Sequence, residues 1–223
     1  FVFDNLYLDC NSIIYESVHE LPYDKNTTNY EAKLIEMTCQ KIKEHIGVIR
    51  PRNRVIVAFD GVAPVAKMNQ QRERRYRSWF QSQVIKDVDE KEGWNTSAIT
   101  PGTEFMKKLG KSVRTYFSNK FSGLRIQVSS SDDVGEGEHK IYDAIRSERE
   151  YHKKTTTVIY GLDADLIMLT LNHLDIAPRL YLYRETPHFI KSVDNTLEPN
   201  QTYVIDIPYF ASCLKAKLLS QTK

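Results

Sequence analysis

Six acidic residues of the sequence each follow an apolar segment, and their spacing suggests a chemistry for the chain. They are Asp9, Asp60, Glu136, Glu138, Asp163 and Asp165. If the apolar segments are parallel strands, their carboxyl ends share one edge of a sheet and the acids converge there. Carboxylates at close range raise one another's pKa, so such a group needs cations to stay ionised. Mg²⁺ and Mn²⁺ prefer carboxylate and water oxygens, and a pair of such ions serves many phosphodiester hydrolases.

The acids also have structural interpretations. Five of the acids could instead cap a helix, lie in the first turn of a helix or form a turn: Asp9, Asp60, Glu136, Asp163 and Asp165. Asp133 and Glu136, for example, have the spacing of a capping box, and Asp163 could cap the helix that follows it. His139 is interpreted as an ordinary helix histidine, because a carboxylate cluster selects an oxygen-loving ion. The recurrence of acids at successive strand ends favours a metal site over these separate explanations.

A basic helix face follows one of these acids. The run 55–59 is apolar and β-branched and ends at Asp60-Gly61, a turn pair. Pro64 can then occupy the first position of a helix. Four residues of that helix share an arc of roughly 100°: Lys67, Gln71, Arg74 and Arg75. Three cations and an amide beside an acidic cluster suit a phosphate group, and a solvated basic helix is the alternative.

The other charged and aromatic residues of this helix receive simpler interpretations. Arg72 and Arg77 lie outside the arc, and we interpret them as solvated charge or contacts to a nucleic-acid backbone. Trp79 and Phe80 are predicted to be core residues.

Strands and helices alternate along the chain. The expected strands are 3–8, 55–59, 124–128, 155–160, 179–184 and 203–207. The expected helices are 12–19, 30–49, 64–88, 101–117, 138–151, 166–171 and 208–219. Thr100 is expected to cap the fourth of these helices, with Pro101 at its first position. The alternation predicts an α/β fold with a mostly parallel central sheet flanked by helices and an acidic cluster at the C-terminal strand ends.

Composition narrows the class of protein. A chain of 223 residues suggests one large domain or one and a half. A net charge of +2 means that any nucleic-acid affinity must come from local clusters of cations. Cys10, Cys39 and Cys213 have no metal-type spacing, which indicates a reducing compartment. No apolar run approaches the roughly 18 residues of a membrane span, so no membrane partner is expected. No lysine-containing glycine-rich loop is present, which argues against a P-loop NTPase.

Four segments resemble the signature sequences of the Xrn family of processive 5′→3′ exoribonucleases. These segments are Leu6–Asn11, Ala58–Arg72, Gly135–Ile141 and Gly161–Ile167. They span nearly the whole chain and follow the family's order. The resemblance implies a PIN-like core of the flap-nuclease type. It also implies that residues 1–223 form an Xrn N-terminal nuclease domain that is incomplete at both ends and part of a larger protein.

The resemblance also implies roles for single residues. The six acids would bind two Mg²⁺ ions, which Mn²⁺ could replace, and would be the catalytic groups. Lys67, Gln71, Arg74 and Arg75 would hold the 5′-monophosphate of single-stranded RNA. Tyr15 stands where familiar members have a histidine that stacks on the first base, and its ring can stack as well. The implied reaction is hydrolysis of RNA to nucleoside 5′-monophosphates in RNA decay or processing, in the cytoplasm with the nucleus as the alternative.

Departures from the family pattern leave two other functions open. Val134 replaces a proline, and the family's next acid, in a segment of the Asn-Asp-Phe-Leu-Pro type, does not occur before the sequence ends at Lys223. A catalytically incomplete Xrn-like RNA-binding or scaffold protein is therefore one alternative. A flap-type, structure-specific DNA nuclease is the other, although such an enzyme would lack the basic helix face.

Overall fold

The computed structural model describes residues 2–23, 29–86, 93–118, 120–186, 190–199 and 201–220, and these are built around one sheet. Its strands are β1 (Asn5–Asp9), β2 (Arg54–Ala58), β3 (Arg125–Ser129), β4 (Thr157–Tyr160), β5 (Leu180–Glu185) and β6 (Thr202–Asp206). They lie in the order β3-β2-β1-β4-β5-β6. Neighbouring strands from β3 to β5 pair in parallel, and β6 pairs antiparallel with β5. The predicted α/β fold with a mostly parallel sheet is confirmed.

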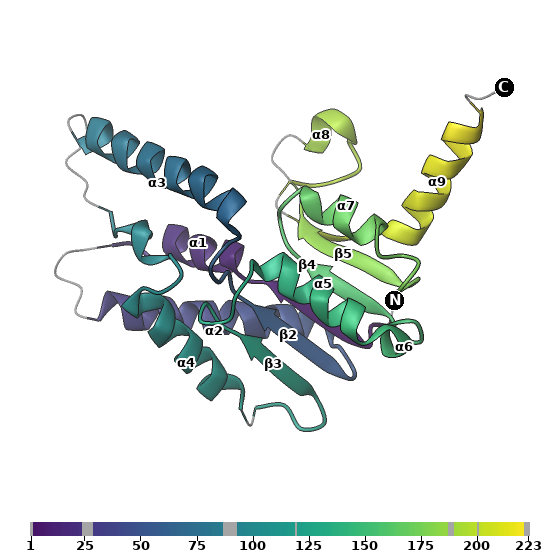
Figure 1. The fold of residues 1–223 in the computed structure, drawn as a ribbon, viewed down its shortest axis with the longest axis horizontal. Helices are drawn as coiled ribbons and strands as arrows, with labels where there is room; N and C mark the ends of the chain where they lie inside the picture. Colours follow the sequence, from purple (N-terminus) through teal and green to yellow (C-terminus); the bar gives the residue numbers. More distant parts are fainter. Residues whose placement is uncertain are drawn as a thin grey trace.

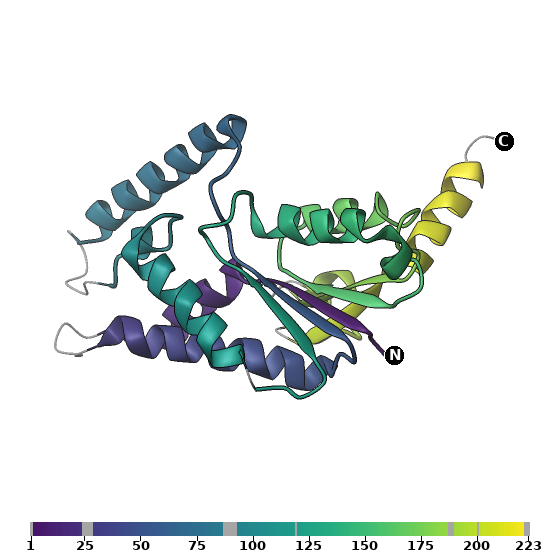
Figure 2. The same ribbon diagram turned by 60° about the horizontal axis from the view of Figure 1, so that its bottom comes forward.

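Helices cover both faces of the sheet (Figures 1 and 2). One face carries α1 (Asn11–Glu20), α2 (Tyr30–Ile49) and α4 (Glu104–Phe117). The other face carries α5 (Gly137–Ser147), α7 (Asp165–Leu171) and the start of α9 (Ile207–Ser220). Successive side chains of β1 point to opposite faces of the sheet. Leu6 and Leu8 pack with the first set of helices, and Tyr7 packs with the second. In the described parts of the chain, no helix is long and apolar enough to cross a membrane.

Several element boundaries match the predictions, and one helix start does not. The predicted helix 30–49 is α2, and its apolar stripe through Ile35, Ile42 and Ile46 is buried. The helix predicted to be capped by Thr100 begins only at Glu104. Its cap is Thr103, whose hydroxyl accepts a hydrogen bond from the Met106 N–H at 3.3 Å. Gly102 has φ +88°, a left-handed conformation that ends any helix, so residues 100–103 form a turn before α4.

The remaining short elements adjust the prediction in detail. The helix predicted over 138–151 is divided into α5 and α6 (Arg149–His152), with Glu148 between them outside helical geometry. A 3-10 helix (Thr96–Ala98) and α8 (Ile190–Val193) were not predicted from the sequence. The sequence also suggests loops over 24–29 and 89–97. Residues 24–28 and 89–92 lie outside the described residues, and 93–95 form an irregular segment that leads into the 3-10 helix.

The basic helix α3 (Val65–Lys86) starts at the carboxyl edge of the sheet and points away from it (Figure 1). Its later turns therefore lie beyond the layer of strands. Trp79 is 55% exposed and Phe80 is 54% exposed, so the prediction that both are core residues is wrong. The reason is the direction of the helix, which leaves these rings without an apolar sheet face to pack on.

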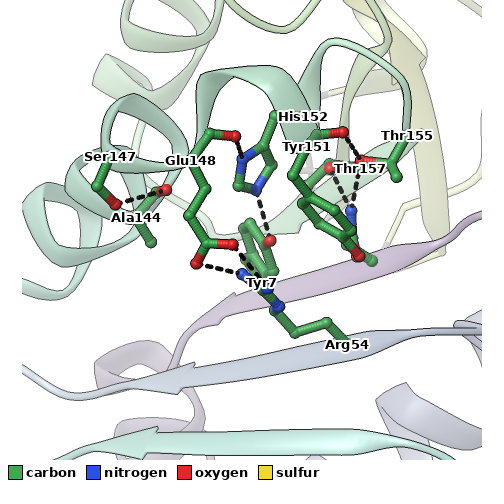
Figure 3. A network of polar contacts seen from close by, with 10 residues as sticks. Tyr7, Arg54, Ala144, Ser147, Glu148, Tyr151, His152, Thr155 and Thr157 are labelled. Carbon is green, nitrogen blue, oxygen red and sulfur yellow. Dashed lines mark hydrogen bonds and ion pairs between the residues drawn. The ribbon is translucent and has the colours of Figure 1, made fainter.

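A buried polar network fastens the opposite end of the sheet (Figure 3). The Arg54 guanidinium donates two hydrogen bonds of 2.8 Å to the Glu148 carboxylate. His152 Nδ1 lies 2.9 Å from the Glu148 carbonyl, which can only accept, so Nδ1 carries the proton and Nε2 accepts from the Tyr7 hydroxyl at 2.7 Å. Burial lowers the pKa of His152, which favours this neutral ring. The network joins β1 and β2 to the end of α5 and to α6.

We predict that Glu148→Gln weakens this network. Arg54 is 8% exposed and would lose its charged partner. The free energy of unfolding should therefore fall by about 1 to 2 kcal/mol. This range already allows for the screening of the ion pair by water, because Glu148 is 43% exposed. The hydrogen bond from Arg54 lowers the pKa of Glu148. Its stabilisation is therefore present above the ordinary glutamate pKa of about 4.3 and lost as the pH falls through the lowered pKa.

Urea unfolding of the wild type and the variant at several pH values tests this prediction. Glu150→Gln, an exposed substitution on α6, is the matched control. An equal loss of stability in the control, or a loss in Glu148→Gln that stays constant down to acidic pH, would contradict it.

Candidate active site

The predicted acids lie at the carboxyl ends of four adjacent strands. Asp9 is the last residue of β1, and Asp60, Glu136 and Asp163 follow β2, β3 and β4. Because these strands are neighbours and parallel, their ends open onto one cavity of about 700 Å³. Five of the six predicted acids line this cavity: Asp9, Asp60, Glu136, Glu138 and Asp163.

Carboxylate oxygens of these acids lie close to one another. One oxygen each from Asp9, Glu138 and Asp163 lie within 4.8 Å of one another. A second group within the same distance comprises Glu136, Glu138 and the His139 ring. Asp9 Oδ1 is buried and has no hydrogen-bond partner among the described residues. A buried, unpartnered carboxylate oxygen among other acids fits a divalent cation that prefers oxygen ligands.

The electrostatics of the group support the same fit. Burial raises the pKa of Asp9 well above its usual range, and the nearby Asp60 and Glu138 raise it further. Burial also raises the pKa of Asp60 and of Glu138, partly offset by the Gly137 N–H at Asp60 and by Lys67 at Glu138. Each group is thus harder to ionise than an exposed acid, and a bound cation would reverse this effect.

Asp60 is held by hydrogen bonds from two other segments. Its Oδ2 accepts from the Asn11 side chain at 2.6 Å, and its own N–H donates to Asn11 Oδ1 at 3.1 Å. Its Oδ1 accepts from the Gly137 N–H at 2.7 Å. Asp60 is therefore more than a turn residue, and Asn11 orients it. The sequence analysis did not find this role of Asn11, because nothing local connects residues 49 positions apart.

The capping interpretations of the other acids are not borne out. Glu136 stands at the cap position of α5, but its side chain makes no cap hydrogen bond and accepts from Lys67 at 2.8 Å. Asp133 accepts hydrogen bonds at the end of β3, so no capping box forms. The cap position of α7 belongs to Ala164 and not to Asp163.

Asp165 differs from the other predicted acids. It is the first residue of α7 and is exposed. Among the described residues, it belongs to neither close group of ligand atoms and does not line the cavity. Its position suits the dipole at the helix start, and its role as a metal ligand stays a prediction.

The predicted phosphate-binding face forms one wall of the cavity. Lys67, Gln71 and Arg75 all line it, and so does Gln70, which the sequence analysis did not single out. Arg75 donates to the Gln71 side chain at 3.4 Å. The side chain of Arg74 lies outside the described residues. The helix therefore places two cations, Lys67 and Arg75, beside the acids of the cavity, and their role in phosphate binding stays a prediction.

Lys67 connects this wall to the acids. Its ammonium lies 2.8 Å from Glu136 Oε2 and 4.0 Å from Glu138 Oε1. Burial acts to lower the pKa of Lys67, but its hydrogen bond and ion pair with Glu136 outweigh burial and raise it. Lys67 therefore stays charged and neutralises part of the acidic cluster.

Tyr15 completes the side of the cavity formed by α1. Its ring is 42% exposed, and it lines the same space as Asp9 and Arg75. The ring is thus accessible to a planar ligand. Its role as a base-stacking residue stays a prediction.

Comparison with known proteins identifies the family. Residues 2–186 match the family described as the N-terminus of XRN 5′-3′ exonucleases. The chain belongs to this family. The XRN chain is 40% identical to 5′-3′ exoribonuclease 2 of Schizosaccharomyces pombe, over 75% of its own length. It is 36% identical to 5′-3′ exoribonuclease 2 of Eremothecium gossypii and 38% identical to 5′-3′ exoribonuclease 1 of Saccharomyces cerevisiae, each over 92% of its length.

The XRN chain spans only part of these relatives. It covers 20%, 24% and 14% of their respective lengths. The match to the family model confirms the predicted family, and the mostly parallel sheet confirms the predicted fold class. The extent of the domain and the roles of the site residues stay predictions.

We predict that Asp9→Asn stabilises the metal-free XRN chain. The substitution removes one of several close, buried negative charges, so the melting temperature in EDTA should rise by a few degrees, at about 2 to 4 °C per kcal/mol. The same change should reduce the stabilisation that Mn²⁺ gives to the wild type, because a ligand oxygen loses its charge.

Melting curves in EDTA and in Mn²⁺ measure both effects. Asp175→Asn removes an exposed acid after α7 and is the control. A lower melting temperature in EDTA together with an unchanged response to Mn²⁺ would show that Asp9 serves packing and not metal binding.

Proposed function

We propose that this chain carries the active site of a 5′→3′ exoribonuclease that hydrolyses RNA with a 5′-monophosphate to nucleoside 5′-monophosphates in RNA decay or processing. One observation carries the proposal: five acids and a cationic helix face line the same cavity. The relatives' names, which describe 5′-3′ exoribonucleases, support the reaction class.

Mg²⁺ is the proposed cofactor, with two ions per site and Mn²⁺ as a substitute. Asp9, Glu138 and Asp163 would hold one ion, and Asp60 and Glu136 would contribute to the second, with Asp165 as a further candidate. Bound there, the ions would activate water and stabilise the leaving oxygen. The protein's own contribution is to fix the carboxylates, as the bonds from Asn11 and Gly137 fix Asp60.

The cationic face would select the end of the substrate. Lys67, Arg74 and Arg75 supply charge and Gln71 an amide, and guanidinium groups bind phosphate oxygens in a defined geometry. A closed pocket of this kind would reject a cap or a triphosphate by size and charge. Tyr15 would stack on the first base of single-stranded RNA.

The state of the cysteines supports a proposal for the compartment. Cys10, Cys39 and Cys213 are all free, and the first two are buried. Free thiols support a reducing compartment, so we propose the cytoplasm, with the nucleus as the alternative.

An RNA degradation assay tests the function. The protein should release mononucleotides from the 5′ end of RNA that carries a 5′-monophosphate, but not from RNA with a 5′-triphosphate or a 5′-hydroxyl. Activity should require Mg²⁺, vanish in EDTA and be lost in Glu138→Gln, which removes a charge from the acidic cluster.

Other outcomes of this assay identify the alternatives. Binding of the 5′-monophosphate end without cleavage would indicate a catalytically incomplete RNA-binding protein. Cleavage of flapped DNA in preference to RNA would indicate a structure-specific DNA nuclease. Either result would contradict the proposal.

A second prediction concerns the predicted phosphate-binding face of α3. Arg75→Ala should raise KM for 5′-monophosphate RNA by roughly 10- to 100-fold, since a hydrogen bond to a charged group contributes about 1.5 to 3 kcal/mol. Because Arg75 lies on the wall that α3 forms and not among the acids, kcat should change much less. The control is Arg72→Ala, which removes an exposed arginine that does not line the cavity among the described residues. Equal effects of the two substitutions would argue for diffuse electrostatic attraction.

A further inference from the structure

Lys140 lies behind the acidic cluster and joins two of its supporting segments. Its side chain comes from α5 and is partly buried. The ammonium donates hydrogen bonds to the Phe59 carbonyl at 2.7 Å and to the Ser130 carbonyl at 2.8 Å. Phe59 directly precedes Asp60, and Ser130 begins the loop that leads to Glu136. One cation thus holds the backbone of both acid-bearing segments.

The two segments also cross each other at close range. The Gly61 N–H donates to the Gly135 carbonyl at 2.8 Å, and the Gly135 N–H donates to the Val62 carbonyl at 3.1 Å. A Cβ atom on Gly61 would lie 1.8 Å from the Asp133 carbonyl oxygen, so the crossing has no room for a side chain. The positions of Asp60 and Glu136 therefore depend on how this crossing is held together.

Lys140 has no direct place in the cavity. Among the described residues it does not line the cavity and makes no ion pair within 4.0 Å. Its two short hydrogen bonds go to neutral carbonyl groups, and an ammonium donor makes these bonds stronger than an uncharged donor would. Its contribution to the site is thus made through the backbone of other residues.

We infer that Lys140 is a positioning residue that sets the separation of Asp60 from Glu136 and Glu138 by joining the ends of β2 and β3. The inference rests on the proposed function only for the metal that these acids would bind. Partners of this kind, one shell behind metal ligands, typically change metal affinity or activity by 10- to 100-fold when they are removed. The sequence offers no signal for this role beyond a lysine two positions after Glu138.

The test compares Lys140→Met, which keeps an unbranched side chain without the ammonium, with the wild type. Without RNA, calorimetric titration with Mn²⁺ should show a Kd raised by about 10- to 100-fold. Hydrogen exchange should accelerate at the Gly61 and Gly137 amides but not at amides in the middle of β1. With RNA, kcat should fall while KM for the 5′-monophosphate substrate stays near the wild-type value.

The controls separate positioning from charge and from folding. Lys153→Met removes an exposed lysine after α6, at the far end of the sheet, and should leave the Mn²⁺ Kd unchanged. Lys140→Arg should restore part of the affinity. If Lys140→Met does not fold, Lys140→Gln, which keeps a donor, replaces it in the titration.

Unchanged Mn²⁺ affinity in a folded Lys140 variant overturns the inference, and so does a loss that Lys153→Met reproduces. A wild type that binds Mn²⁺ but cleaves no RNA would contradict the proposed function alone. In that case the Mn²⁺ titration still decides the role of Lys140.

Discussion

The parallel pairing of β3, β2, β1 and β4 is the constraint on which the site depends. Parallel strands bring their carboxyl ends to one edge, and in this chain each of those ends leads into an acid. The sheet is stabilised by two apolar layers, with the side chains of β1 directed alternately into them. Hydrophobic burial thus holds in place a group of carboxylates that would otherwise repel one another.

The protein balances that repulsion with several different groups. The Gly137 amide and the Asn11 side chain donate hydrogen bonds to Asp60. The Lys67 ammonium pairs with Glu136. Lys140 donates to backbone carbonyls of the two segments that carry these acids. These donors come from α1, α3 and α5. The acidic edge is therefore assembled jointly by elements from most of the chain, while the network around Arg54 fastens the opposite end.

The sequence predicts those features that depend on local pattern. The period of apolar residues locates α2 to the residue, and acids after apolar runs identify the strand ends. It fails where the answer depends on tertiary placement. Trp79 and Phe80 have the composition of core residues, but their burial depends on the direction of α3, which no local pattern encodes. Contacts across long separations, such as Asn11 with Asp60, are likewise invisible before the sheet order is known.

The ion pair between Lys67 and Glu136 has a consequence for how ligands bind together. On the proposed function, the Lys67 ammonium would be shared between the Glu136 carboxylate, 2.8 Å away, and a phosphate held on the wall that α3 forms. A divalent ion bound to Glu136 would weaken the attraction of that carboxylate for Lys67, and a phosphate that attracts Lys67 would leave Glu136 freer for the ion. The proposed metal and phosphate sites would then be positively cooperative, and by linkage each ligand would strengthen the binding of the other by the same factor.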